Sequence, residues 1–275
     1  MALTSAHAYD LVAPAYDLLT NGYAYERWLG AIDRLARSHG LAGRRALDVA
    51  CGTGKSLEAL LDLGYEAVGC DGSPGMAAVA RAKLGHRTAV HVADMRWLPV
   101  YGAFDLVTCL DDAFNHLGSA ADVVRALRAL ARNLGAGGLL VFDVNTLSAY
   151  RDVGDRIVED GGRIVLWHGG PARLDAPGGR AEVALDVLNR RADGLWRRTS
   201  ASWGHWHYPL EVIPALVADA DLEVVAVRGQ RTGGRLELDA DEERHSKAVF
   251  LVRAAAGQRT AGRATPKGGN MPWQP

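Results

Sequence analysis

The sequence LDVACGTG, residues 47–54, decides the fold of this chain. An apolar run at residues 46–50 is broken only by Asp48, which is typical of a parallel strand covered on both faces. Glycines follow where the run ends, and glycine allows a sharp turn and a close backbone approach to a ligand. Residues 55–63 carry leucines at helical spacing, so we predict a strand, a glycine turn and a helix.

An acidic residue, Asp71, follows at the end of a second apolar run, 17 residues beyond Gly54. This is the layout of a nucleoside-binding strand–helix–strand unit. A phosphate-binding P-loop would need a glycine at Val49, and a dinucleotide fingerprint would need one at Leu57. The residues therefore argue against an ATP site and weaken the case for NAD. They fit best a ligand that has a ribose and no phosphate.

Residues 48–54 resemble motif I of class I S-adenosylmethionine (SAM) dependent methyltransferases, whose common form is D-x-G/A-C-G-T-G. The resemblance continues in order through the second to fifth strands of that family, up to residue 144. The segments that carry it are residues 67–76, 92–96, 104–110 and 134–142. Ala136 departs from the family by standing where a proline is usual. The chain is most similar to the small-molecule branch, which includes glycine N-methyltransferases and deoxysugar N,N-dimethyltransferases.

The resemblance implies an α/β fold with a Rossmann-like, seven-stranded, mostly parallel sheet and helices on both faces. Residues 1–44 would form an N-terminal helical lid, and residues 45–149 and 209–254 the SAM-binding domain. An antiparallel sheet inserted after the fifth strand, residues 150–208, would cover the acceptor site. Residues 255–275, rich in Ala, Gly, Arg and Pro, are predicted to be a disordered tail.

Composition and turn signals locate further elements. Three strands of the insertion are predicted at residues 163–168, 180–190 and 195–208, with Asp193-Gly194 as a hairpin signal. An amphipathic helix is predicted at residues 25–38. The last two strands of the main sheet are expected at residues 222–227 and 248–252.

The resemblance also implies SAM as the cofactor. Asp71 would hold the ribose hydroxyls, Asp94 the adenine amino group, and Met95 would pack on the base, while Asp48 would organise the glycine loop. The other expected cofactor contacts along these motifs are Ala50, Gly52, Gly54, Gly72, Met76 and Leu110. The alternative for the aspartates is that they end strands or cap helices.

The N-terminal segment carries two aromatic candidates for the cofactor site. Small-molecule members of the family begin with a similar Y-D-x-x-A-x-x-Y-D segment, so Tyr16 is expected to close over SAM. Trp28 is a second candidate, with core packing as its alternative.

His116 is the expected base or orienting group for the acceptor, because ligands bind at the carboxyl ends of strands in open α/β sheets. Helix capping or a surface position is its alternative. His205 and His207 would face one side of a strand and Trp206 the other, and His207 is a second catalytic candidate. The expected substrate contacts are Asp112, Asn115, Asn145, Trp167 and His205. No metal is expected, because the His-x-His pair has no further ligand at fixed spacing.

The composition of the chain limits the classes of molecule that it is expected to bind. The chain has 275 residues, 48% hydrophobic residues and a formal net charge of −1, which disfavours nucleic acid and favours a small-molecule acceptor. Three cysteines without a Cys-x-x-Cys motif, and no long apolar run, indicate a cytoplasmic protein without a membrane span. The inserted sheet could also pair across a homodimer.

The predicted function is methyl transfer to a small molecule, with N-methylation favoured over O- or C-methylation and a role in secondary metabolism as one option. Two alternatives stay open. One is a nucleic-acid or protein methyltransferase, although residues 108–112 lack the N/D-P-P-Y motif of amino-directed DNA enzymes. The other is a SAM- or NAD-binding protein without transferase activity.

Overall fold

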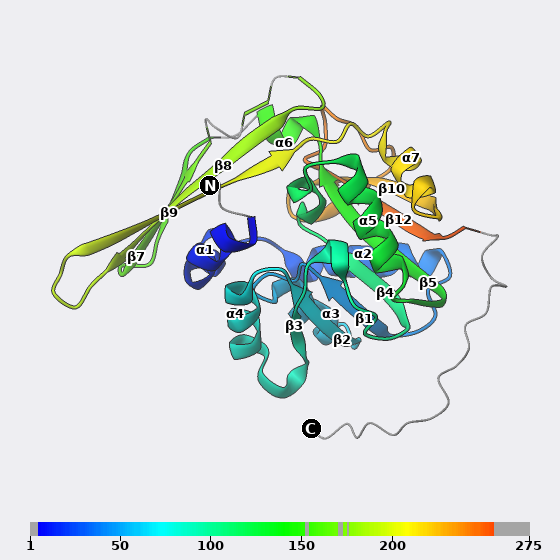
Figure 1. The fold of residues 1–275 in the computed structure, drawn as a ribbon, viewed down its shortest axis with the longest axis horizontal. Coiled ribbons are helices and arrows are strands. Elements are labelled where there is room, and N and C mark those ends of the chain that lie inside the picture. Colours follow the sequence, from blue (N-terminus) through cyan, green and yellow to red (C-terminus); the bar gives the residue numbers. More distant parts are fainter. Residues whose placement is uncertain (1–4, 152–153, 170–172, 175, 256–275) are drawn as a thin grey trace.

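The computed structural model describes residues 5–151, 154–169, 173–174 and 176–255. Five strands of its main sheet run parallel: β1 (Arg45–Val49), β2 (Glu66–Asp71), β3 (Val90–Val92), β4 (Phe104–Cys109) and β5 (Leu134–Asn145). Three more pair antiparallel at one edge: β10 (Leu222–Arg231), β11 (Arg235–Glu237) and β12 (Lys247–Ala254). The strand order is β11-β10-β12-β5-β4-β1-β2-β3, so the order reverses between β1 and β4 (Figure 1).

The mostly parallel Rossmann-like sheet predicted from the sequence is confirmed, with eight strands where seven were expected. The additional strand is β11, which pairs with the end of β10. Its three residues are too few to show the period-2 pattern by which a strand is recognised in a sequence.

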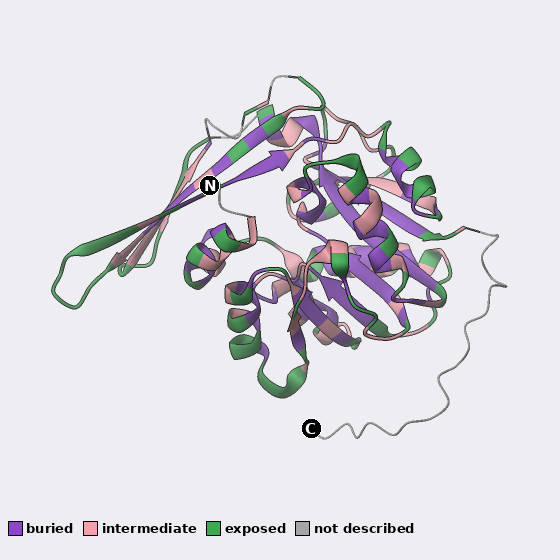
Figure 2. Ribbon diagram, in the orientation of Figure 1, coloured by how far each residue is buried: buried purple, intermediate pink, exposed green. Residues whose placement is uncertain are grey.

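Helices cover both faces of the main sheet. The face lined by α2 (Tyr25–Ser38), α3 (Lys55–Asp62) and α4 (Pro74–Leu84) buries one apolar cluster against the strands. On the other face, α5 (Ala120–Ala131) and α7 (Ile213–Asp219) bury a second one. The central strands are therefore buried along most of their length (Figure 2). Short helical segments complete the connections: η1 (Gly85–Arg87), η2 (Met95–Trp97), η3 (Ala113–His116) and α6 (Leu147–Arg151).

A second, antiparallel sheet lies between β5 and α7 in the sequence, as predicted. Its strands are β6 (Arg156–Glu159), β7 (Arg163–His168), β8 (Arg180–Arg190) and β9 (Trp196–Trp206), in that order. Strands β7 and β8 have the bounds that the sequence predicts. β6 was not predicted, because a strand of four residues is too short to show a clear period-2 pattern, although the Asp160-Gly161-Gly162 turn that follows it is a hairpin signal.

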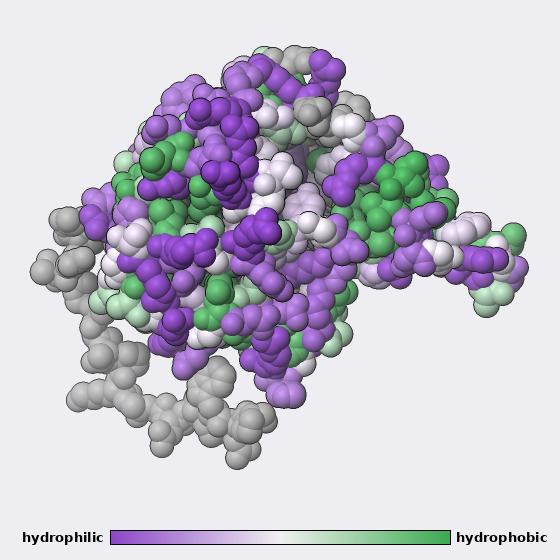
Figure 3. Space-filling view, turned by 180° about the vertical axis from the view of Figure 1, so that it is seen from behind, coloured by the Kyte–Doolittle hydropathy of each residue, from purple (hydrophilic) through white to green (hydrophobic). Residues whose placement is uncertain are grey.

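The far ends of β8 and β9 form an arm that projects from the body of the molecule. Gly194 adopts a φ of +83° in the turn between the two strands, and Leu195 beside it is 63% exposed. The arm is exposed at its tip and buried toward its base (Figure 2). Viewed from behind, hydrophobic surface gathers where the arm leaves the body (Figure 3).

Helix α1 (Ser5–Leu19) joins the two sheets. Its buried residues, among them Val12 and Leu19, pack with Met76 of α4 and with Val183, Leu185 and Trp203 of the second sheet. Figure 1 shows α1 between the second sheet and α4. Among the described residues, the apolar cluster of the second sheet thus joins the main domain through this helix and α4.

Within the described residues, no helix combines the length and apolar character that crossing a membrane requires. From residue 256 on, the predicted tail lies outside the part of the chain that the structure describes.

Candidate active site

A cavity of about 770 Å³ lies where α1, the carboxyl ends of the parallel strands and the second sheet meet. Ten of the residues expected at the site line it: Tyr16, Ala50, Gly52, Asp71, Gly72, Met76, Asp94, Met95, Leu110 and His116. These come from α1, from the ends of β1, β2 and β4, from the segment after β3, from α4 and from η3. The strand ends thus bring together residues that are far apart in the sequence.

The Asp71 carboxylate at the end of β2 is held by the glycine loop. The backbone N–H of Gly52 donates to one of its oxygens and that of Ser73 to the other, each at 2.8 Å. A carboxylate oxygen accepts more than one hydrogen bond, so both oxygens keep a lone pair for a ligand. Burial raises the pKa of Asp71 to about 6.

Asp48 lies behind the cavity wall, not on it. It is 1% exposed and accepts hydrogen bonds from the hydroxyls of Ser56 (2.6 Å) and Thr108 (2.7 Å). These bonds tie the start of α3 and strand β4 to β1, and burial raises the pKa of Asp48 to about 6. Gly54, with a φ of +88° at the start of α3, is also outside the lining. Both residues shape the loop from behind.

The part of the cavity lined by Asp71, Asp94 and Met95, where the sequence predicts the cofactor, is the cofactor half. The segment after β3 forms one end of it. Asp94, with Met95 beside it on the cavity wall, accepts three side-chain hydrogen bonds from Arg96, the shortest being 2.6 Å. Although burial works in the opposite direction, these bonds lower the pKa of Asp94. The aspartate expected to meet the adenine is thus ionised and already oriented by Arg96.

Helix α1 presents two tyrosines to the cavity, Tyr9 and Tyr16. They are seven residues apart, hence on one face of the helix, and their rings meet edge-on at 5.8 Å. Tyr16 was expected here and Tyr9 was not. The repeated Tyr-Asp pair at this spacing was the signal that could have identified Tyr9.

The two aspartates of the same segment fix α1 on the cofactor half. Asp10 accepts hydrogen bonds from the Ser73 hydroxyl (2.6 Å) and the Gly75 backbone N–H (2.7 Å). Asp17 accepts one from the Thr53 hydroxyl (2.5 Å) and forms an ion pair with Lys83 (2.6 Å). The tyrosines therefore close the cavity while the aspartates hold the helix in place.

The end of the cavity lined by Asp111 and His116, where the sequence predicts the acceptor, is the acceptor end. A buried charge cluster lies beneath it. Asp111, on the cavity wall, forms an ion pair with Lys247 of β12 at 2.6 Å and accepts a hydrogen bond from the Tyr25 hydroxyl at 2.8 Å. Asp143 accepts the backbone N–H groups of Asp111 and Asp112, each at 2.7 Å. Three carboxylates thus surround one ammonium group, which leaves an excess of negative charge beside the cavity.

The backbone at this point is strained. Asp111 and Asp112 have φ values of +62° and +60°, which is costly for residues other than glycine. The bonds to Asp143 stabilise this conformation, and the turn directs the following η3 helix with His116 toward the cavity. None of these contacts follows from local sequence, because Asp143 and Lys247 come from distant strands.

His116 meets two side chains at the acceptor end. Its Nε2 atom lies 3.2 Å from the Tyr9 hydroxyl and 3.3 Å from Nε2 of His205. Burial, followed by repulsion from His205, lowers the pKa of His116, and burial lowers the pKa of His205 to about 3. Both imidazoles are therefore neutral. Nδ1 of His116 is buried without a hydrogen-bond partner within the described residues.

Two tryptophans expected at the site lie away from the cavity. Trp28 of α2 is 3% exposed and packs in the apolar cluster on the α2, α3 and α4 face of the main sheet, and the ammonium of Lys247 lies 5.8 Å from its ring centre. Trp167 packs against the apolar cluster shared by α1 and the second sheet. Large aromatic side chains stabilise a core by the area that they bury. Trp28 is buried in this way, whereas Trp167 is only partly buried.

The remaining expected contacts form the support of the acceptor wall. Asn115 is fully buried, donates to the carbonyl oxygen of Trp206 (2.8 Å) and accepts the backbone N–H of Asn145 (2.9 Å). The Asn145 side chain in turn donates to Asp112 at 2.9 Å. His205 and Asp112 lie behind His116 and outside the cavity lining.

His207, expected to be catalytic, is also fully hydrogen-bonded away from the cavity. Its Nδ1 accepts the backbone N–H of Gly178 at 3.0 Å, and Nε2 lies 3.0 Å from a carboxylate oxygen of Glu242. The two histidines of the His-x-His pair do face one side of β9, since the ring of Tyr150 contacts both. Their ring nitrogens have different partners: His205 contacts His116, whereas His207 bonds to Gly178 and Glu242.

Several lining residues were missed by sequence analysis. The acceptor wall includes Arg180 and Glu182 of β8, and Trp206 of β9, over whose ring the Arg180 guanidinium lies at 5.3 Å. The alternation in β8 correctly indicated one polar face. A sequence pattern does not tell whether a polar face meets solvent or a cavity, so these residues could not be assigned.

The match to a family model covers residues 46–138, and the description of that model is "Methyltransferase domain". The chain is 38% identical over 129 residues, 45% of its length, to a glycine/sarcosine/dimethylglycine N-methyltransferase of Actinopolyspora halophila. The aligned segments span between 22% and 58% of the length of the curated relatives.

Solved structures match over nearly the whole chain. An S-adenosylmethionine-dependent methyltransferase of Clostridium acetobutylicum superposes with a TM-score of 0.73 at 21% identity, over 90% of this chain and 99% of that one. The sugar N-methyltransferase KedS8 of Streptoalloteichus sp. superposes with a TM-score of 0.70 at 30% identity, covering 87% of this chain and 93% of that one. The chain belongs to the S-adenosylmethionine-dependent methyltransferases.

Proposed function

We propose that this methyltransferase transfers a methyl group from SAM to a small-molecule acceptor, most favourably to an amine. The observation that carries the proposal is the single cavity, which connects the Asp71 carboxylate at one end with Asp111 and His116 at the other. A donor and an acceptor can thus be held in line, and alignment is the main catalytic contribution in methyl transfer.

The residues of the cofactor half fit SAM. Asp71 keeps lone pairs for two ribose hydroxyls, as the bonding to Gly52 and Ser73 leaves them free. Asp94 and Met95 lie at the end where the adenine would stack, and Tyr9 and Tyr16 close over the centre. The cofactor supplies the activated methyl group. The excess of carboxylates around Asp111 favours the positive charge of a sulfonium.

At the acceptor end, we assign to His116 the role of orienting the acceptor and taking up its proton. A neutral imidazole on the cavity wall can accept a hydrogen bond from an amine or hydroxyl. N-methylation is favoured because two of the proteins named above are N-methyltransferases, and because a neutral amine attacks without a base. Arg180, Glu182 and Trp206 would contact the rest of the acceptor.

The proposal divides the chain by task. Residues 45–149 and 209–254 would bind the cofactor, residues 1–44 would cover it, and residues 150–208 would shape the acceptor pocket. A cytoplasmic location agrees with three free, buried cysteines. A homodimer would use the second sheet, and light scattering of the purified protein would test it.

Two measurements test the function. Calorimetric titration with SAM, its demethylated product and NAD should show binding of the first two, whereas binding of NAD alone would overturn the proposal. Mass spectrometry of a metabolite extract incubated with the enzyme and methyl-labelled SAM should then reveal the acceptor. Gain of two labelled methyl groups on one nitrogen would establish amine chemistry.

A further inference from the structure

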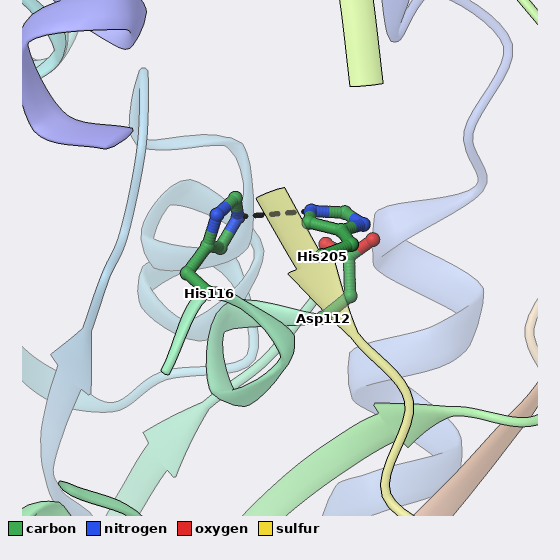
Figure 4. A group of neighbouring side chains, drawn as sticks. All are labelled: Asp112, His116 and His205. Atoms are coloured by element: carbon green, nitrogen blue, oxygen red, sulfur yellow. Dashed lines mark hydrogen bonds between the residues drawn. The ribbon is translucent and has the colours of Figure 1, made fainter. Parts of the chain in front are cut away.

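Three potential metal ligands converge behind the acceptor wall. Asp112 lies just before η3, His116 at its end, and His205 near the end of β9 (Figure 4). One ligand atom of each residue lies within 4.8 Å of the other two. Figure 4 shows the two imidazole rings directed at each other, with the Asp112 carboxylate beside His205.

In the His116 tautomer that is protonated at Nδ1, both facing nitrogens carry lone pairs. The indole N–H of Trp203 donates to Nε2 of His205 at 3.3 Å, so this nitrogen has no proton. The Tyr9 hydroxyl can donate to Nε2 of His116 at 3.2 Å. Both hydrogen bonds are at the long, weak end of the usual range. A cation between the two nitrogens would replace weak bonds with strong ones.

The spacing suits a metal ion of the zinc class. Zinc binds imidazole nitrogen at about 2.0–2.1 Å, so two histidines at a tetrahedral angle place their nitrogens about 3.4 Å apart. The two Nε2 atoms are 3.3 Å apart. The 4.8 Å limit for the carboxylate leaves an adjustment of about 1 Å for it to reach a shared ion.

The surroundings supply compensating charge. Asp112 would contribute one negative charge directly, and Asp111 and Asp143 lie next to it, opposed by Lys247. Two histidines and one carboxylate are a common ligand set of divalent transition metals. We propose that Asp112, His116 and His205 bind one divalent transition-metal ion of the zinc class at the acceptor end of the cavity.

The site has a consequence that goes beyond methyl transfer. A bound ion occupies the His116 nitrogen that would otherwise meet the acceptor. The metal and the acceptor therefore compete, while the cofactor half is left intact. Micromolar zinc should inhibit transfer competitively with the acceptor, and a chelator should restore it.

Titration with Co²⁺, followed by visible absorption, tests the site on the full-length protein. We expect one Co²⁺ per chain with the d–d absorption of a tetrahedral ion, displaced by Zn²⁺. His205→Gln should weaken binding beyond the roughly 10- to 100-fold that loss of an outer-shell partner costs. His168→Gln is the matched control, since His168 lies in the same sheet and pairs with Asp186 at 2.8 Å. Equal affinity in His205→Gln and the control, or no bound ion in the wild type, would overturn the proposal.

A second variant covers the case in which His205→Gln does not fold. Asp112→Asn retains the oxygen that accepts from Asn145 and removes only the charge, so it should fold and bind Co²⁺ at least tenfold more weakly. Unchanged Co²⁺ binding in folded Asp112→Asn would exclude this ligand set. Calorimetry with SAM on the same samples separates the two proposals, because a protein that binds SAM but no metal contradicts only the metal site.

Discussion

At the scale of single residues, Asp71 combines two tasks. Its carboxylate fixes the glycine loop through Gly52 and Ser73, and it faces the cavity with its remaining lone pairs. A hydrogen bond to a charged group contributes about 1.5–3 kcal/mol. The residue is therefore the most sensitive point of the proposed cofactor site.

Replacement of Asp71 by Asn should weaken SAM binding by about tenfold or more, because the charge that strengthens both ribose bonds is lost. Calorimetry would measure the dissociation constant. Asp62→Asn is a suitable control, since Asp62 is a surface carboxylate that pairs with Arg87. Equal SAM affinity in the two variants would contradict the role of Asp71.

Asp48 predicts an unusual pH dependence of stability. Burial raises its pKa from 3.8 to about 6 in the folded state, so the folded protein binds a proton more tightly than the unfolded chain does. Lowering the pH from 7 to 5 should therefore raise the free energy of unfolding, by about 1 kcal/mol from this group.

The comparison with Asp48→Asn isolates that contribution. Urea unfolding at pH 7 and pH 5 should show the gain in the wild type and a smaller gain in the variant, which has no proton to take up. Identical pH dependence in both proteins would show that Asp48 does not titrate in this range.

At the scale of secondary-structure elements, α1 acts as a fixed cover whose two functions lie in one short segment. Tyr9 and Tyr16 face the cavity, and Asp10 and Asp17 bind to the loops at the starts of α3 and α4. A spacing of seven residues repeats both contacts two helical turns apart. The segment thus needs few residues to place a lid accurately.

Replacement of Asp10 by Ala should accelerate SAM dissociation by about tenfold, because the bonds to Ser73 and Gly75 are lost. Alanine favours helix formation, so α1 itself should remain. Stopped-flow displacement of bound SAM would measure the rate. Glu66→Ala, an exposed carboxylate on β2, should leave it unchanged; a similar rate in Asp10→Ala would show that α1 does not retain the cofactor.

Asn115 connects η3, β5 and β9, and its replacement should lower the free energy of unfolding. Asn115→Ala leaves the Trp206 carbonyl and the Asn145 N–H without partners, at about 1–3 kcal/mol each. Denaturant unfolding would show a decrease of about 2–4 kcal/mol. Asn189→Ala on the arm of the second sheet, where the residue is half-buried, should cost much less.

The elements that sequence analysis predicted correctly have strong local patterns. The helix at Tyr25–Ser38 and the strands at Arg163–His168 and Arg180–Arg190 have their predicted bounds. The residues of the family motifs that line the cavity were also predicted, because those motifs lie at the carboxyl ends of the strands. The pairing of Asp111 with Lys247, and of His116 with His205, depends on strands more than 80 residues apart. Such contacts are set by the register of the sheets, which no local pattern specifies.

At the scale of the whole molecule, the cavity is a joint product of three parts. The main sheet supplies the cofactor end, the second sheet the acceptor wall, and α1 the contact between them. Neither sheet encloses the cavity alone. Cofactor binding should therefore stabilise all three parts against local opening.

Hydrogen exchange with and without SAM would test this coupling. We expect slower exchange in residues 5–19, 50–56 and 110–116, because ligand binding stabilises the closed state of the parts that enclose it. The arm tip, residues 191–195, should exchange at the same rate in both samples. Protection confined to residues 50–56 would mean that the lid and the acceptor wall act independently.

The arm formed by β8 and β9 has a practical consequence. Its base carries Arg180, Glu182 and Trp206, whereas its tip turns at Asp193 and Gly194 well away from them. The turn is therefore a suitable attachment point for a fluorescent dye, an affinity peptide or a tether to a solid support, because none of these would reach the cavity. The same hairpin thus offers a handle for immobilising the enzyme and, at its other end, the wall to redesign when a different acceptor is wanted.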